Sequence, residues 1–182
     1  MSIAFRRRDL HLIGQEDYQP VSAGSQTIRR MWAQGRDYRR GSASDWSPII
    51  EAALVGIRNG CGQVGWDGDG ALPVSDRTID VAAKVTDCLF ALLPKDTPAP
   101  DLVPEPDGEI CISWSIDADR MFSVSVGAHG KINFAGQFGA EGALHAWQPI
   151  DPKNRASLEE SLQDVARCVG RLYAPPALQR AA

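Results

Sequence analysis

The sequence lacks the features that mark several large classes of protein. No apolar run approaches the roughly 18 residues that a membrane-spanning helix needs. Residues 1–13 place arginines among scattered apolar residues, whereas a secretory signal needs an apolar stretch of about 7–15 residues. We therefore expect neither a membrane span nor an export signal.

What is present is typical of a globular domain. The 182-residue chain is 43% hydrophobic and 23% charged, which excludes a largely disordered or collagen-like chain. At this length a compact domain buries roughly 70% of its unfolded surface, enough for one core. The formal charge of −4 excludes a protein that binds nucleic acid over its whole surface.

Cysteine is sparse and is not arranged for metal binding or disulfide exchange. None of the four cysteines forms a CxxC pair, which argues against a zinc ribbon or a thioredoxin-like site. Cys88 and Cys168 fall on apolar faces of predicted helices, where a free thiol acts as a small hydrophobe. With no export signal, this predicts unpaired thiols in a cytoplasmic protein. We expect no cofactor and no metal.

Charge divides the chain into two parts. Residues 1–45 carry eight Lys and Arg against five Asp and Glu, and residues 46–182 carry eleven against eighteen. The first part has few periodic apolar residues and contains Pro20 and Gly24. We therefore expect a basic, partly extended N-terminal arm over 1–45 and a single domain over 46–182.

Apolar residues recur at helical spacing in three segments of the body. Each segment has residues that suit the start or the end of a helix. The predicted helices span Pro48–Asn59, with Ser47 as cap and Gly60 as a left-handed stop, then the segment between the Ser75 cap and Pro94, then about Arg155–Tyr173.

Three further segments alternate apolar with polar or small residues, as half-buried strands do. They cover Ile110–Ile116, Phe122–Val126 and Ile132–Phe134. Residues 95–106 contain four prolines and form an extended connector. The pattern predicts an α+β fold, a three-stranded antiparallel meander covered by about three helices.

Three motifs carry a resemblance. They are Trp66-Asp67-Gly68-Asp69-Gly70-Ala71-Leu72-Pro73, then Pro106-Asp107-Gly108-Glu109-Ile110 with Trp114 after it, and the glycines between Gly136 and Gly142. Together they resemble a family of small bacterial and phage proteins with a Trp-Asp-Gly-x-Gly-Ala-x-Pro motif followed by a helix and a β-meander. That family has no assigned activity, so the resemblance implies a fold unit and a bacterial or phage setting, and it carries over no catalytic residue.

The segment 60–73 contains two patterns that imitate ligand-binding motifs. Residues 60–65 match G-x-G-x-x-G, but a helix is predicted before them rather than after them, so no nucleotide site is expected. Asp67 and Asp69 lack the later ligands of a calcium loop. Two interpretations stay open: a turn held by these aspartates and pinned by Trp66, or a recognition loop.

Catalytic groups are few. No histidine lies in a local nucleophile or zinc motif. A small hydrolase would have to use His145 or His129 with Asp67 or Asp69, and one such pair would then lie within hydrogen-bonding reach in a cleft. Asp117 and Asp119 are interpreted as turn residues.

The arm combines arginine with aromatic residues, as protein interfaces often do. A solvated tail and a nucleic-acid contact are the alternatives. The predicted partner-binding residues are Arg29, Arg30, Trp32, Arg36, Tyr38, Arg39 and Arg40 of the arm, with Trp66, Asp67 and Asp69 of the body.

The leading hypothesis is a non-enzymatic cytoplasmic protein-interaction module that binds a protein partner. The suspected setting favours an accessory or inhibitor protein of a bacterial or phage toxin–antitoxin or defence system. The small hydrolase and a nucleic-acid binder acting through the arm are the alternatives.

Overall fold

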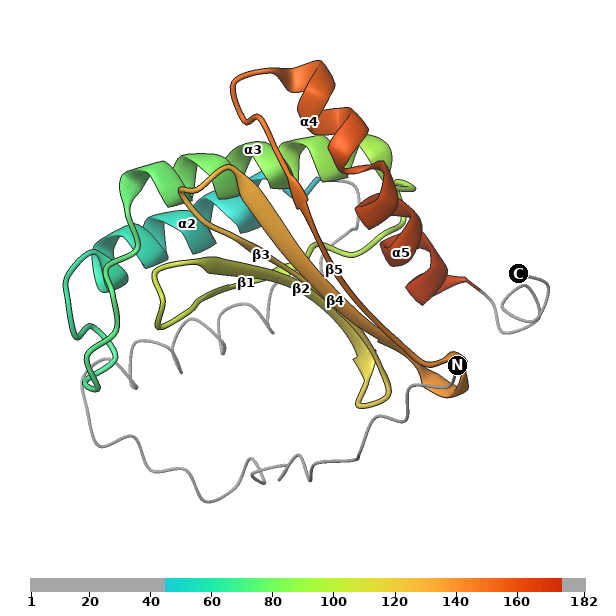
Figure 1. Cartoon of the computed structure of the whole chain (residues 1–182), viewed down its shortest axis with the longest axis horizontal. Coiled ribbons are helices and arrows are strands. Elements are labelled where there is room, and N and C mark those ends of the chain that lie inside the picture. The colour runs from blue at the N-terminus through green and yellow to red at the C-terminus, as the bar shows by residue number, and fades with distance from the viewer. Residues whose placement is uncertain (1–44, 175–182) are drawn as a thin grey trace, which may run out of the picture.

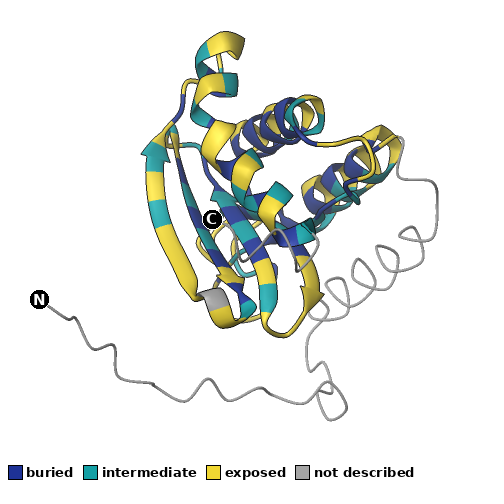
Figure 2. Cartoon of the chain, turned by 90° about the vertical axis from the view of Figure 1, so that its right-hand side faces the viewer, coloured by how far each residue is buried: buried dark blue, intermediate teal, exposed yellow. Residues whose placement is uncertain are grey.

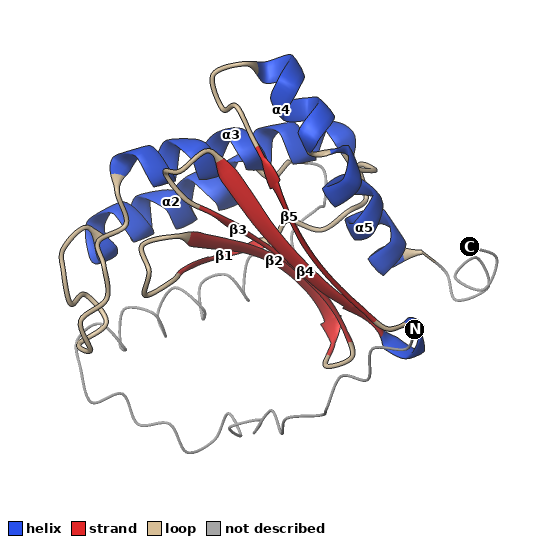
Figure 3. Cartoon of the chain, viewed as in Figure 1, coloured by secondary structure: helices blue, strands red, loops and turns tan. Residues whose placement is uncertain are grey.

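The computed structural model describes residues 45–174, and it has the expected α+β architecture. One antiparallel sheet has its strands in chain order, and the helices lie on one of its faces (Figures 1 and 3). The predicted arm lies outside the described residues, apart from Asp45. The elements are α2 (Ser47–Cys61), α3 (Asp76–Leu92), β1 (Asp101–Pro104), β2 (Ile110–Asp117), β3 (Arg120–Val126), β4 (Lys131–Phe138), the 3-10 turn η1 (Gly139–Glu141), β5 (Ala143–Pro149), α4 (Arg155–Ser161) and α5 (Gln163–Tyr173).

The prediction of three strands was wrong, because the sheet formed by residues 45–174 has five. β1 lies inside the proline-rich connector, where prolines do not preclude an edge strand. β5 has only one large apolar residue on each face, so it lacks the strong alternation of a half-buried strand. Both missed strands are edges: within residues 45–174 each has a neighbouring strand on one side only.

The helix α2 departs from prediction at both ends. Ser47 is its first residue rather than its cap, and the Asp45 carboxylate accepts a hydrogen bond of 2.9 Å from the Ser47 amide. Gly60 does not stop the helix, which continues to Cys61. Cys61 is fully buried on the same face as Ile57, so burying this side chain outweighs the preference of glycine for a helix end.

The helix α3 follows the sequence closely. The Ser75 hydroxyl accepts a hydrogen bond of 3.1 Å from the Thr78 amide, as expected of a capping serine. Val74 before this cap and Ile79 after it are both buried, as in a hydrophobic staple. The helix ends at Leu92, shortly before Pro94.

The last predicted helix is divided in two at Leu162. Asn154 caps α4 through the Ser157 amide. Leu162 is fully buried, and its amide bonds to the carbonyls of Leu158 and Glu159. The break turns α5 so that it packs against β3 and β4, while α4 packs against α3.

The core lies between the helices and the inner face of the sheet. Ile112, Phe122 and Val124 are fully buried there. β4 continues past the predicted end at Phe134, and Gly136 leaves room for the rings of Phe122 and Phe138. No helix within residues 45–174 is long and apolar enough to cross a membrane.

Candidate binding surface

The Trp66–Pro73 segment is a self-contained turn. The Trp66 indole donates to the Leu72 carbonyl at 2.9 Å, and only 8% of the Trp66 side chain is exposed. The Asp67 carboxylate accepts from the amides of Asp69 (2.8 Å) and Ala71 (3.0 Å), and these bonds hold the Asp67 pKa below its usual range. The turn interpretation is therefore confirmed. A partner contact at Trp66, Asp67 and Asp69 stays a prediction.

Two of the motifs that carry the resemblance meet in space. The Leu72 amide donates to the Pro106 carbonyl at 2.7 Å. Gly108 has a positive φ of 83°, and a Cβ there would lie 3.0 Å from the Pro73 carbonyl oxygen. Glycine is therefore required at 108 by both conformation and space.

Beside this junction lies a shallow cleft of about 220 Å³. His129 lines it together with Asp107 and Glu109, but Asp67 and Asp69 do not. His145 lies elsewhere, on β5 opposite Ala135. The described structure therefore does not assemble a histidine with either aspartate in this cleft.

The two acidic residues of the cleft, Asp107 and Glu109, lie close to a third carboxylate. Carboxylate oxygens of Glu105, Asp107 and Glu109 lie within 4.8 Å of one another, and this is the one group of potential metal ligands of its kind in residues 45–174. Burial raises the pKa of Glu109, and the charges of Asp107 and Glu105 add to the effect. The Ser125 hydroxyl donates to Glu105 at 2.8 Å. All three carboxylates come from one hairpin turn, so they form an acidic turn rather than a built cation site.

The cysteines are not activated thiols. Burial raises the pKa of Cys61 to about 11 and that of Cys111 to about 12. Burial also raises the pKa values of Cys88 and Cys168. All four are unpaired, as predicted. A nucleophilic cysteine needs the opposite shift, so this geometry gives no support to cysteine catalysis.

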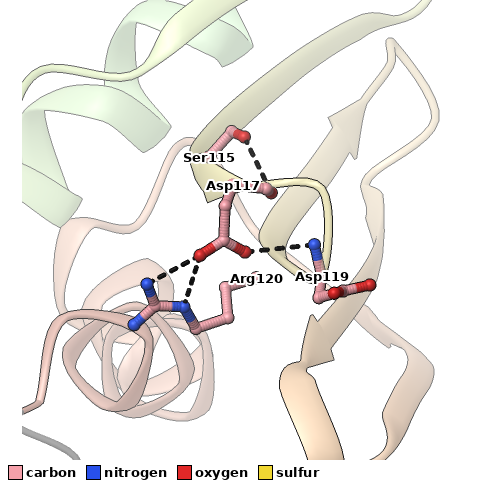
Figure 4. Close-up of polar contacts among 4 residues, drawn as sticks. All are labelled: Ser115, Asp117, Asp119 and Arg120. Carbon is pink, nitrogen blue, oxygen red and sulfur yellow. Dashed lines mark hydrogen bonds and ion pairs between the residues drawn. The ribbon is translucent and has the colours of Figure 1, made fainter.

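The turn between β2 and β3 is also explained by local bonds (Figure 4). The Asp117 carboxylate accepts from the Arg120 guanidinium at 2.7 and 2.9 Å and from the Asp119 amide at 3.1 Å. The bond to Arg120 is the main cause that lowers the Asp117 pKa. The interpretation of Asp117 and Asp119 as turn residues is confirmed.

The sheet face opposite the helices is the largest feature that the sequence did not reveal. No helix of residues 45–174 covers this face, and we call it the helix-free face. The strand register puts a row of small or polar side chains along its middle, with His145 of β5 at one end. Its residues are Val103, Cys111, Ser113, Ser115, Met121, Ser123, Ser125, Asn133, Ala135, Gln137, Ala143, His145 and Trp147, with the charged Asp101 and Lys131 near its corners.

Two large apolar side chains stand on this face. Trp147 is 66% exposed at the β5 edge, and Met121 is 44% exposed on β3. In Figure 2, β5 is the largely exposed strand at the left of the sheet, with no described segment beyond it. An exposed Trp beside small side chains is typical of an interface anchor. Sequence reasoning missed Trp147 because it did not recognise β5 as a strand.

The remaining predicted site residues lie outside the described residues. They are Arg29, Arg30, Trp32, Arg36, Tyr38, Arg39 and Arg40. Their partner-binding role stays a prediction.

Comparison with known proteins found no match. No family model, no curated protein and no solved structure is similar to the chain at a significant level. The resemblance to the Trp-Asp-Gly-x-Gly-Ala-x-Pro family therefore rests on the motif residues alone.

Proposed function

We propose that the chain is a non-enzymatic protein-interaction module whose described part binds its partner through the helix-free face. The observation that supports this is the exposed Trp147 standing beside the row of small, uncharged side chains along the middle of the helix-free face. Short side chains such as Ser123 and Ala135 let a partner approach the strands closely. Trp147 supplies the apolar area that dominates binding energy in many interfaces.

Charge indicates what the partner looks like. Residues 45–174 carry ten Lys and Arg against nineteen Asp and Glu. A partner with an apolar centre and a basic rim would therefore be attracted and oriented by the body. The bacterial or phage resemblance favours an accessory or inhibitor role in a toxin–antitoxin or defence system, in which the acidic body competes with nucleic acid for a basic groove.

The two alternatives have weaker support. The small hydrolase has a histidine in the cleft, but His129 stands there without Asp67 or Asp69. A nucleic-acid binder would act through the arm, and its binding would fall steeply with rising salt.

The test is purification of the full chain from its native host, with four single variants. Ser123→Arg places a long charged side chain in the middle of the helix-free face, and Trp147→Ala removes the anchor. The matched controls are Ser47→Arg on α2 and Val64→Ala, since Val64 is 73% exposed on a different surface.

The proposal predicts a stoichiometric protein that the wild type and both controls retain and that both face variants lose. A partner that both face variants retain would contradict the proposed surface. Recovery of DNA or RNA, lost on nuclease treatment or at high salt, would favour the nucleic-acid alternative.

A further inference from the structure

No strand of the described part of the chain pairs with the outer edge of β5, which has backbone groups available for hydrogen bonding. The Phe138 amide donates to Gly142, and the Ile150 amide donates to Gly130. In the antiparallel register of β4 and β5, these bonds show that even-numbered β5 residues bond to β4. Odd-numbered residues therefore direct their N–H and C=O groups away from the sheet. These residues are Ala143, His145, Trp147 and Pro149, and only Pro149 lacks an N–H.

The opposite edge of the sheet is blocked. The Glu105 amide donates to the Glu109 carbonyl, so even-numbered residues of β1 point outward. The outward positions around this strand are Pro100, Leu102 and Pro104. Only Leu102 has an N–H, so the edge of β1 cannot support a further ladder.

The β5 edge lacks the usual protection against pairing. Exposed edges are commonly guarded by charged side chains, prolines or bulges. None of the seven residues of β5 has a charged side chain, and its one proline is the last residue. Leu144 and Trp147 are exposed, by 37% and 66%. Gln148 is tied to α4 through the Ser161 carbonyl, which leaves the outward groups of β5 unaffected.

We propose that β5 pairs with β5 of a second copy of this chain, antiparallel across a two-fold axis at His145. In this register Ala143, His145 and Trp147 each exchange both hydrogen bonds with a residue of the second copy, and Pro149 stays outside the ladder. The register also sets the large Trp147 of one copy opposite the small Ala143 of the other. The strand is thus complementary to itself in shape and in hydrogen bonding.

Because only one edge of the sheet is open, we expect one further copy to bind, and no more. A sheet with two open edges would extend into a fibre, whereas one open and one blocked edge close into a dimer. The body is acidic, so two copies would repel each other over most of their surfaces. β5 itself has no charged side chain, so a second copy can pair there without that repulsion. The two sheets become continuous, and both Trp147 side chains stand on the same helix-free face. The inference goes beyond the proposed function and does not depend on it.

The first test is the mass of the purified full chain in solution, by sedimentation equilibrium. We expect a dimer of twice 19.7 kDa. His145→Pro removes the central outward N–H at a position where an edge strand tolerates proline. It is expected to raise the dimer Kd by about tenfold or more, whereas His145→Ala leaves the mass unchanged. A monomeric wild-type chain at all concentrations would overturn the proposal.

The second test fixes the register and does not depend on a proline. Residues paired directly across antiparallel strands have Cα atoms about 5.5 Å apart, within the range of a disulfide. Under mild oxidation His145→Cys is expected to form a covalent dimer, because residue 145 meets itself at the axis. Ala143→Cys, on the same strand and face, is the matched control and is expected to stay monomeric on non-reducing gels. Equal cross-linking of both variants, or of neither, would contradict the proposed pairing.

Discussion

The sheet ends in two edge strands that differ in length, composition and attachment. β1 has four residues, and a proline stands at one of its outward positions, with Pro100 just before the strand. Buried indoles hold the connector that leads into it, since Trp46 donates to Thr97 and Trp114 donates to Pro98, each at 3.1 Å. β5 has seven residues and carries an exposed tryptophan.

The two edges also differ in how they use tryptophan. Near β1, Trp46 packs its ring against Phe90 and Trp114 at centroid distances of 5.3 and 6.1 Å. On β5, Trp147 stands on the surface. A buried tryptophan with a bonded N–H stabilises the fold, whereas an exposed one adds little to stability and is available for binding.

The largest expected effect compares these two tryptophans. Trp46→Ala should lower the free energy of unfolding by about 3–5 kcal/mol, as for other buried aromatic residues. Trp147→Ala should change it by no more than about 0.5 kcal/mol. Urea denaturation of both variants measures the difference. Similar losses at the two positions would mean that Trp147 is part of the core.

The next effect concerns the strand that joins β5 to the core. A Cβ on Gly136 would lie 2.6 Å from a carbon of the Phe122 ring, so Gly136→Ala should cost about 1–3 kcal/mol through overpacking. Gly170 on α5 has nothing within 4 Å of its Cβ position, so Gly170→Ala should stabilise by about 0.4–1 kcal/mol. Thermal unfolding of both variants shows whether the first lowers the melting temperature and the second raises it. A neutral Gly136→Ala would show that β4 has room to shift.

A smaller effect should follow from opening the blocked edge. Pro104→Ala restores an outward N–H next to that of Leu102, at a cost of about 0.4–1 kcal/mol from the freer unfolded chain. With two open edges, the chain should form species larger than a dimer as its concentration rises. Light scattering after size-exclusion chromatography measures them. If the variant keeps the wild-type mass, proline is not what blocks β1.

The smallest effect concerns the acidic turn between β1 and β2. Burial raises the pKa of Glu109 in the folded chain, so the ionised side chain destabilises the fold increasingly as pH rises through that pKa. Glu109→Gln should therefore be more stable than wild type at pH 7, and the gain should disappear below the ordinary glutamate pKa of 4.5. Urea titrations at both pH values test this. Glu160→Gln is the control, since it makes the same substitution on α4, away from the turn. An equal gain in stability there would contradict the effect of Glu109 burial.

The sequence predicted what strong periodicity and local caps determine. The helix after the Ser75 cap and the three central strands were recognised because each buries one regular apolar face. The Asp67 turn was recognised because aspartate and glycine act on their own neighbours. These signals are local, so a single sequence contains them.

The edges were missed because an edge strand needs less apolar alternation than a central one. Pro104 argued against a strand, although an outward-facing proline loses no ladder bond. Ala143 and Ala146 gave β5 little hydrophobic pattern. The candidate surface depends on β5, so it could not be found before the register with β4 was known. The break at Leu162 also depends on packing against other elements.

The most direct test of the contrast between the edges is amide hydrogen exchange in the full chain at several protein concentrations. The amides of Ala143, His145 and Trp147 should exchange more slowly as the concentration rises, because pairing covers them. The amides of Leu144 and Ala146, which face β4, should be protected at every concentration, and that of Leu102 on β1 should not change with concentration. If the three outward amides of β5 exchange at one rate at all concentrations, β5 is not the open edge through which the chain associates.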